Sequence, residues 1–279
     1  MITRFAPSPT GPLHLGHAYS ALLAYDMAQS AQGGFLVRIE DTDSTRCRPE
    51  HEAAIIADLA WLGCTWPTPL RQSDHLDDYQ AALNLLNQKG LMFPCDCNRR
   101  ALLETGAGHG PDGPIYPGTC EHRKMTDAAP TDALRLNLQK ARAFLPDQLH
   151  FIETGCGVPL IKNFTTADVI KTIGSPILRR KDTCDPAYHL ACTHDDANQG
   201  VTHVIRGEDV APSTPIHLIL QHLMGWPTPI YYHHRLIMDA SGKRLAKIDH
   251  SRALSKYRAE GVTLTDIRRM VGLPISSGA

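Results

Sequence analysis

Two histidines lie three residues apart at the amino end of a predicted helix. His14 and His17 follow a proline-rich turn, and their spacing places both rings on one helix face. The free N–H groups and positive dipole at this end of a helix favour an anion. Gly16 leaves room for a flat group such as a nucleobase to approach the backbone. The pattern is compatible with a nucleotide site, although an isolated pair of this kind is more often two partly exposed histidines and can also share a zinc ion.

Charged side chains follow two further apolar runs. Glu40 comes directly after the run Phe35–Ile39, and Arg206 lies near the end of the run 200–207. Ligands bind at the carboxyl edge of a parallel sheet, where a guanidinium can hold a carboxylate by two hydrogen bonds. A carboxylate there can pair with an ammonium group. The alternatives are a solvated strand end for Glu40 and a surface ion pair for Arg206.

A cluster of thiols marks the middle of the chain. Cys95 and Cys97 are separated by one residue, and Tyr116 and Cys120 follow. Thiols suit a tetrahedral structural zinc, which would stabilise a segment that is poor in apolar residues. The alternative is three reduced cysteines in an irregular loop. On general chemistry, two histidines are other candidates for the fourth ligand: His109 and His122.

The elements that must position these residues alternate between strand and helix. The sequence predicts a strand over Ile2–Phe5, a helix over Leu13–Gln32 and a strand over Phe35–Ile39, the first βαβ unit of a parallel sheet. Regular periodicity is lost from Phe93 to Pro130, so we expect an α/β domain interrupted by an insertion. The other predicted elements are helices over Pro49–Leu62, Ser73–Lys89 with Ser73 as N-cap, and Thr214–Met224, and a strand within 200–207.

Composition bounds the class of protein. The chain has 279 residues, is 42% apolar and carries 28 basic and 29 acidic side chains, so a basic footprint for nucleic acid must be local. Eight cysteines in a chain of this length do not suit a secreted disulfide framework. No apolar stretch is long enough to span a membrane, and no signal peptide opens the chain. These features predict a cytoplasmic protein with no membrane partner.

The opening residues Arg4–His17 resemble those of glutamyl-tRNA synthetases, which are class I aminoacyl-tRNA synthetases. The resemblance continues through Arg38–Asp43, Pro186–Leu190 and Gly200–Asp209. It implies ATP bound at His14, Gly16, His17 and Lys247, with His14, His17 and Lys247 catalytic. It also implies L-glutamate bound by a second set of residues: Arg4, Phe5, Ala6, Pro7, Ser8, Glu40, Tyr188 and Arg206.

Lys247 lies in a string that resembles the mobile lysine-rich loop of class I synthetases. Glutamyl enzymes often show Lys-Leu-Ser-Lys, whereas this chain has Arg244 and Ala246 in place of the first lysine and the serine. Lys247 keeps the position of the second lysine, which stabilises the triphosphate as pyrophosphate leaves. On its own, this string would be taken for a solvated basic loop.

The order C-x-C followed by Y-x-x-x-C resembles the zinc site of glutamyl-queuosine tRNA(Asp) synthetases, short paralogues of glutamyl-tRNA synthetase without the C-terminal anticodon-binding domain. The implied Zn²⁺ ligands are Cys95, Cys97, Tyr116 and Cys120. The chain stops soon after Lys247, so we expect that domain to be absent. The implied fold is a class I Rossmann-type parallel sheet with an inserted zinc-containing acceptor-type subdomain. Its expected segments are 1–92 and 187–240 for the two catalytic halves, 93–186 for the insertion, and 241–279 for the loop and C-terminal helices.

This resemblance implies a ligase that uses ATP, with Mg²⁺, to activate L-glutamate as glutamyl-adenylate. We expect the protein to be a monomer. The acceptor would be queuosine at the anticodon wobble position of tRNA(Asp). Candidates for phosphate contacts are Arg99, Arg100, Arg179, Arg180 and Lys181. Three alternatives remain: a truncated glutamyl-tRNA synthetase charging the 3′ end of tRNA(Glu), a nucleotidyltransferase without an RNA substrate, and a catalytically inactive zinc-containing RNA-binding module.

Overall fold

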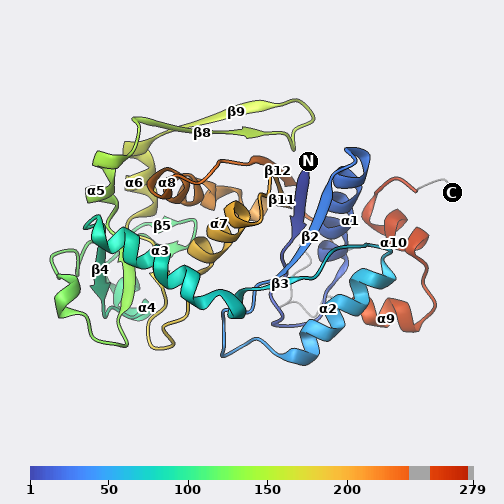
Figure 1. The fold of residues 1–279 in the computed structure, drawn as a ribbon, viewed down its shortest axis with the longest axis horizontal. Coiled ribbons are helices and arrows are strands. Elements are labelled where there is room, and N and C mark those ends of the chain that lie inside the picture. The colour runs from blue at the N-terminus through green and yellow to red at the C-terminus, as the bar shows by residue number, and fades with distance from the viewer. Residues whose placement is uncertain (239–251, 276–279) are drawn as a thin grey trace. The chain divides into compact units, whose positions relative to one another are not determined.

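The computed structural model describes residues 1–238 and 252–275, and the chain forms two compact units (Figure 1). The first unit contains residues 1–74, 201–209 and the chain from 230 onward, and the second contains residues 75–200 and 210–229. Within the described ranges, no helix combines the length and the apolar character that a membrane span needs.

Parallel strand pairs form the centre of the first unit. β1 pairs with β2 from Ile2 opposite Gly34 to Phe5 opposite Val37, β2 pairs with β3, and β11 pairs with β12, all in parallel. This confirms the predicted βαβ unit. The strands of this unit are β1 (Ile2–Phe5), β2 (Gly34–Ile39), β3 (Leu70–Arg71), β11 (His203–Gly207) and β12 (Ile230–His234).

The crossover helix α1 (Leu15–Ser30) lies against β1 and β2 (Figure 1). Its fully buried alanines let the helix backbone approach the sheet closely, and the Thr3 hydroxyl donates to the Ala24 carbonyl oxygen at 2.9 Å. After the helix, Gly33 has no room for a side chain, because a Cβ there would lie 1.9 Å from the carbonyl oxygen of Met1. The turn into β2 therefore requires glycine.

Further helices of the first unit are held by ion pairs as well as by the apolar core. Arg268 on α10 grips the Asp26 carboxylate on α1 with two hydrogen bonds of 2.7 and 2.8 Å. On α9, Arg258 lies 3.5 Å from the buried Asp58 of α2. These helices are α2 (Pro49–Trp61), α9 (Leu254–Ala259) and α10 (Leu264–Val271).

The second unit contains antiparallel strands and helices. β4 pairs with β7, and β7 with β10, while β8–β9 and β5–β6 form hairpins. The strands are β4 (Met92–Cys95), β5 (His109–Gly110), β6 (Gly113–Pro114), β7 (Ala133–Leu136), β8 (Gln148–Glu153), β9 (Leu160–Thr165) and β10 (Ile177–Arg179). The helices are α3 (Leu76–Gln88), α4 (Arg99–Glu104), α5 (Leu138–Ala141), α6 (Thr166–Ile173), α7 (Tyr188–Asn198) and α8 (Thr214–Met224).

Two local details differ from the sequence expectation. Ser73 does not cap the helix that follows, because its hydroxyl donates to Asp41 at 2.6 Å and α3 begins only at Leu76, after a 3₁₀ turn. The stretch from Phe93 also opens with regular structure, because it begins within strand β4. Every position of β4 is buried, so the strand lacks the alternation of buried and exposed residues that would have marked it in the sequence. The short 3₁₀ helices are η1 (Gln72–His75), η2 (Met125–Asp127), η3 (Arg142–Phe144) and η4 (Glu208–Ser213).

The contrast between Gly33 and Gly34 yields a stability prediction. Gly33→Ala should lower the free energy of unfolding by about 1–3 kcal/mol, because its methyl group collides with the Met1 carbonyl and forces β1 and β2 apart. Gly34→Ala is the matched control, since a Cβ there meets nothing within 4 Å and should change stability by no more than about 1 kcal/mol. Urea unfolding of both variants measures the difference, and equal stabilities would contradict the packing described.

Candidate active site

Both histidines of the signature take part in capping α1. His14 is the N-cap residue, with its Nδ1 accepting a hydrogen bond from the Gly16 N–H at 3.1 Å. The His17 Nδ1 accepts from the His14 N–H at 3.1 Å, and the ring centroids lie 3.9 Å apart. Because each Nδ1 is an acceptor, each neutral ring carries its proton on Nε2. The helix end thus presents two imidazoles of fixed tautomer.

Gly16 is required by the cap itself. A Cβ at this position would lie 2.9 Å from Cε1 and 3.1 Å from Nδ1 of His14. Any side chain at position 16 would therefore displace the capping ring. This reason for glycine is separate from the room for a nucleobase that the sequence suggested.

Three charged residues lie at the carboxyl edge of the parallel strands in the first unit. Arg4 is near the end of β1, Glu40 follows β2, and Arg206 is near the end of β11. All three are buried, with 4%, 8% and 7% of their surface exposed. Arg4 Nη1 donates to the carbonyl oxygen of Ile205 at 3.3 Å, which ties β1 to β11 at this edge. The sequence placed Glu40 and Arg206 at strand ends, whereas Arg4 was named only through the family resemblance.

Glu40 is fixed on both sides of its peptide and at its carboxylate. Its N–H donates to the Pro7 carbonyl oxygen at 3.0 Å, and its own carbonyl oxygen accepts from the Ser8 hydroxyl at 2.7 Å. Oε1 pairs with Nη2 of the fully buried Arg38 at 3.1 Å. A buried carboxylate needs such compensation. These bonds also dock the Pro7–Ser8 segment beside it.

Asp41 and Asp43, the other acids of this string, shape the loop. Asp41 accepts hydrogen bonds from the Ser73 N–H and hydroxyl. Asp43 accepts from Thr45 and pairs with Arg46 Nε at 2.6 Å. These two acids therefore hold the loop together, and neither is the N-cap of the next helix, α2, which is Arg48.

Arg206 has a partner that the sequence did not reveal. Its Nε donates to Nε2 of His233 at 3.1 Å, and its guanidinium lies 5.1 Å from the centre of the Tyr231 ring. His233 sits directly opposite Arg206 in the β11–β12 register. No spacing along the chain signals this pair, since it depends on how two distant strands align.

Three thiols meet in the second unit. The sulfur atoms of Cys95, Cys97 and Cys120 all lie within 4.8 Å of one another, and those of Cys97 and Cys120 are 3.6 Å apart. The Tyr116 hydroxyl oxygen lies 3.6 Å from the Cys95 sulfur and accepts a hydrogen bond from the Cys120 N–H at 2.6 Å. Among the described residues, neither candidate histidine belongs to this group. The cluster can bind a metal ion.

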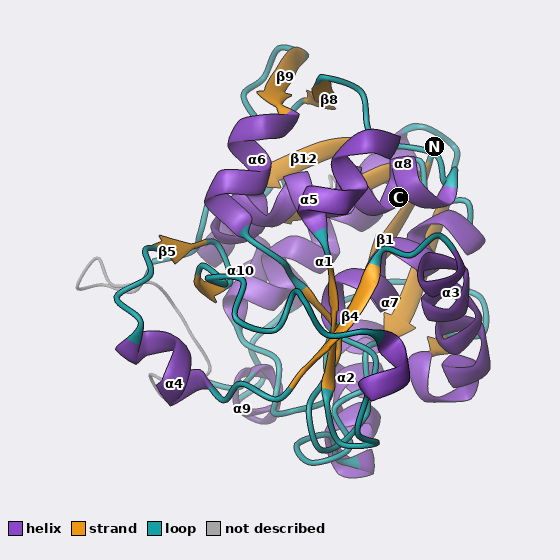
Figure 2. Cartoon of the chain, turned by 90° about the vertical axis from the view of Figure 1, so that its left-hand side faces the viewer, coloured by secondary structure: helices purple, strands orange, loops and turns teal. Residues whose placement is uncertain are grey.

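A cavity of about 500 Å³ also lies in the second unit. Its walls include α4, which packs beside the β5–β6 hairpin (Figure 2), and the first residues of α7. Tyr188, the first residue of α7, lines this cavity, with its ring 5.2 Å from that of His189 and 5.8 Å from that of His217. Tyr188 belongs to a different unit from Arg4, Glu40 and Arg206.

Asp112, on the β5–β6 turn, anchors a chain of hydrogen bonds beside this cavity. Its Oδ2 lies 2.7 Å from His189 Nε2, and His189 Nδ1 lies 3.1 Å from His217 Nε2. The Ser213 hydroxyl donates to Asp112 Oδ1 at 3.0 Å. Burial raises the pKa of Asp112, but the bonds from His189 and Ser213 outweigh it and hold the pKa below its ordinary value. No spacing along the sequence signals these hydrogen bonds.

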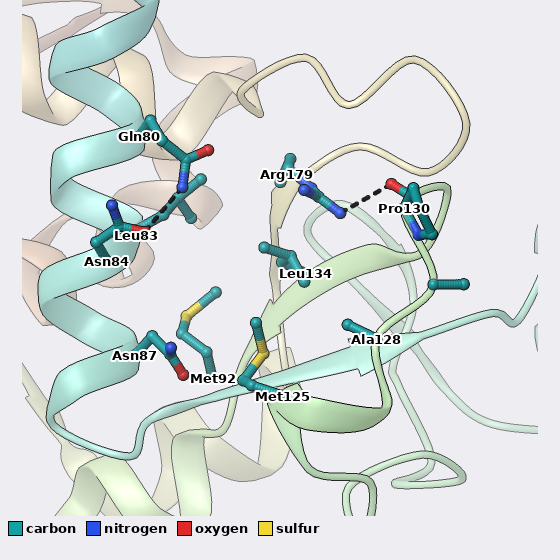
Figure 3. A pocket seen from close by; sticks show the side chains of 11 residues that line it. Gln80, Leu83, Asn84, Asn87, Met92, Met125, Ala128, Pro130, Leu134 and Arg179 are labelled. Atoms are coloured by element: carbon teal, nitrogen blue, oxygen red, sulfur yellow. Dashed lines mark hydrogen bonds between the residues drawn. The ribbon is translucent and has the colours of Figure 1, made fainter.

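A second pocket, of about 260 Å³, lies between α3 and the β4–β7 strands (Figure 3). Its walls are amides and apolar groups with one guanidinium, that of Arg179, which donates to the carbonyl oxygens of Pro130 and Asp132. No carboxylate, histidine or thiol is among the described residues that line it, so it offers no group for acid–base chemistry.

Comparison with known proteins decides the family. Residues 1–115 and 164–274 match the tRNA synthetases class I (E and Q), catalytic domain. The glutamyl-Q tRNA(Asp) synthetase of Rhodobacter capsulatus is 50% identical over 98% of this chain and 100% of its own. The chain belongs to the glutamyl-Q tRNA(Asp) synthetase family. Its relative of the same name from Nocardia farcinica is 38% identical over 92% of this chain and 79% of its own.

Solved structures agree with this assignment. A glutamate-tRNA synthetase from Elizabethkingia anophelis has a TM-score of 0.71 and 27% identity over 90% of this chain. The chain spans about half of that protein, 53% of its length. A methionyl-tRNA synthetase from Mycobacterium tuberculosis, with a TM-score of 0.62 and 10% identity, shares the fold alone. The predicted family and class I α/β fold are thus confirmed, and ATP use follows from the family.

One set of predicted site residues lies outside the described ranges. Lys247, with Arg244 and Ala246 of the same string, falls between residues 238 and 252. Their roles therefore stay predictions from the sequence.

The Gly16–His14 contact predicts the effect of a single methyl group. Gly16→Ala should push the His14 ring out of its cap, because the new carbon would lie 2.9 Å from Cε1. We expect ATP binding to weaken by about tenfold, which corresponds to the loss of one good polar contact. We also expect the chemical shift of His14 Nδ1 to change, because this nitrogen no longer accepts a hydrogen bond. Equilibrium ATP binding and imidazole nitrogen chemical shifts measure both effects, with Gly34→Ala as the control. Unchanged shifts and affinity would contradict the cap geometry.

Proposed function

We propose that this protein activates L-glutamate with ATP and transfers the glutamyl group to queuosine in the anticodon of tRNA(Asp). One observation carries the proposal. Two buried guanidiniums, of Arg4 and Arg206, and one buried carboxylate, of Glu40, lie at one sheet edge in the first unit. Glutamate carries two carboxylates and one ammonium group, so this set is its charge complement. The glutamyl-Q tRNA(Asp) synthetase relatives supply the acceptor.

The amino acid would be bound by both fixed side chains and backbone. Arg4 and Arg206 take its carboxylates, and Glu40 takes its ammonium group. The segment Phe5–Ser8, whose last two residues bond to the Glu40 peptide, forms the adjoining wall. Tyr188 adds a phenol, by resemblance to the glutamyl family. Because the charged groups are held before the ligand arrives, binding loses little side-chain conformational entropy.

ATP would bind at the amino end of α1. The Nε2–H groups of His14 and His17 would donate to phosphate oxygens, and the dipole of the helix adds to the attraction. Gly16 keeps the cap in place and leaves the backbone accessible. Lys247 would neutralise the departing pyrophosphate. Mg²⁺ is expected to arrive with the triphosphate, which is how it usually binds at such sites.

The first step is the attack of a glutamate α-carboxylate oxygen on the α-phosphorus of ATP. A new carboxyl O–P bond forms, the bond from the α-phosphorus to the bridging oxygen breaks, and pyrophosphate leaves with that electron pair. The residues named here orient the reactants and stabilise the charge that moves toward pyrophosphate. In the second step a queuosine hydroxyl attacks the glutamyl carbonyl carbon, AMP leaves, and an ester of glutamate remains.

The cysteine cluster fits a structural zinc with tyrosine as fourth ligand. Zinc–sulfur bonds of about 2.3 Å in a tetrahedron place two sulfurs about 3.8 Å apart, near the 3.6 Å between Cys97 and Cys120. The Tyr116 oxygen already accepts from the Cys120 N–H, so it presents lone pairs beside the thiols. Cys95, Cys97, Tyr116 and Cys120 would hold the ion, whose part is to stabilise this segment of the second unit.

Transfer assays with defined tRNAs test the acceptor. We expect glutamate transfer to tRNA(Asp) that contains queuosine and none to tRNA(Asp) that lacks it, because only the modified base offers the cyclopentenediol hydroxyl. tRNA(Glu) should remain uncharged. Periodate does not discriminate, since it destroys the terminal ribose diol as well. Charging of tRNA(Glu) alone would overturn the proposed acceptor, and the absence of glutamate-dependent pyrophosphate exchange would overturn the activation step.

Metal analysis tests the ligand set. Cys97→Ser should reduce bound zinc from about one ion per chain to a small fraction, since a structural site needs all four ligands. The melting temperature should fall with it, because metal binding contributes folding free energy. Cys156→Ser, an exposed cysteine outside the cluster, is the control. Undiminished zinc in Cys97→Ser would reject the proposed ligands.

A further inference from the structure

The cavity of about 500 Å³ in the second unit has the composition of a nucleotide site. Its volume lies within the range of about 300–1,000 Å³ typical of small-ligand pockets. Arg99, Arg135, Arg180 and Tyr188 are among the residues that line it. Among the described residues that line it, Asp112 is the one carboxylate. The cations suit phosphate, the aromatic ring suits a base, and the carboxylate suits a positively charged substituent.

Asp112 is held firmly and remains accessible. His189, buried at 8% exposure, and Ser213 each engage one of its oxygens, at 2.7 and 3.0 Å. His189 is braced in turn by His217, which is 1% exposed. The Asp112 side chain is nevertheless 45% exposed. Each carboxylate oxygen can accept more than one hydrogen bond, so a ligand can still approach this group.

We propose, on the basis of the function above, that this cavity binds the queuosine nucleotide and that Asp112 recognises its charged amine. Queuosine is a deazaguanosine whose cyclopentenediol is attached through a secondary amine, which is protonated near neutral pH. Asp112 pairs with this ammonium group, and Tyr188 contacts the deazaguanine base or the cyclopentene ring on either side of the amine. Arg99 and Arg180 lie where the flanking phosphates of the anticodon loop can be bound.

The occupancy of both Asp112 oxygens favours the ammonium group over the edge of the base as its partner. Recognition of a guanine-type edge uses both carboxylate oxygens in parallel, and here each oxygen already has a protein donor. A single cation can instead lie beside either oxygen.

A charge-removing substitution tests the role of Asp112. Asp112→Asn keeps the size of the side chain and loses the charge, and Asp147→Asn is an exposed control in the same unit. The rate of glutamate transfer to tRNA(Asp) containing queuosine is divided by the rate of glutamate-dependent pyrophosphate exchange, measured on the same sample. This ratio should fall about ten- to a hundredfold in Asp112→Asn, the range for a lost hydrogen bond to a charged group, and stay constant in Asp147→Asn.

Nucleoside competition with the wild-type protein provides an independent measurement. Deazaguanosine bearing an aminomethyl group carries the cation, whereas deazaguanosine itself lacks it. The first should inhibit transfer at about tenfold lower concentration than the second. Equal inhibition by the two nucleosides, or an unchanged ratio in Asp112→Asn, would overturn this inference and leave the proposed function standing. A wild-type protein that activates glutamate without transferring it to queuosine would instead refute the proposed acceptor.

Discussion

The compensation of buried charge at the carboxyl edge of a parallel sheet is the constraint on which the candidate site depends. Arg4, Glu40 and Arg206 are all withdrawn from water, and an uncompensated buried charge would destabilise the fold. Each is therefore anchored, Arg4 to a strand carbonyl, Glu40 to Arg38, and Arg206 to a histidine. The same anchors that make burial tolerable keep these groups in one arrangement, and a preorganised set of charges is what recognition of a small zwitterion requires.

Local patterns in the sequence were sufficient to predict the first βαβ unit. Helical spacing after a proline-rich turn predicted α1, and a short apolar run predicted β2, because both elements bury one regular set of side chains. Spacing could not find His233, which meets Arg206 only through the register of two strands. Nor could it find Asp112, which reaches His189 across 77 positions of the chain. The prediction that Ser73 is an N-cap was wrong for a related reason. Its hydroxyl donates to Asp41, a residue distant in the sequence, and so does not cap the helix.

The thiol cluster shows what three-dimensional geometry adds to residue type. Residue chemistry alone left Tyr116, His109 and His122 as candidates for a fourth ligand, and only the family resemblance favoured the tyrosine. In the structure, the Tyr116 oxygen lies beside Cys95 and accepts a backbone hydrogen bond from Cys120, while the Arg135 guanidinium covers its ring at 4.0 Å. A phenol is a weak ligand in water. Burial and the hydrogen bonds with the Cys120 and Cys95 side chains raise the pKa of Tyr116 and favour the neutral phenol, and the Cys120 N–H opposes this shift only in part. Zinc binding would therefore have to displace the hydroxyl proton.

The reciprocal histidine cap links the ionisation of a ring to the order of a helix. A doubly protonated imidazole has two N–H groups and no lone pair to offer. Were His14 to gain a second proton, its Nδ1 could no longer accept from the Gly16 N–H, and the first turn of α1 would lose its terminating contact. The amino end of α1 therefore keeps this cap only while the His14 ring is neutral.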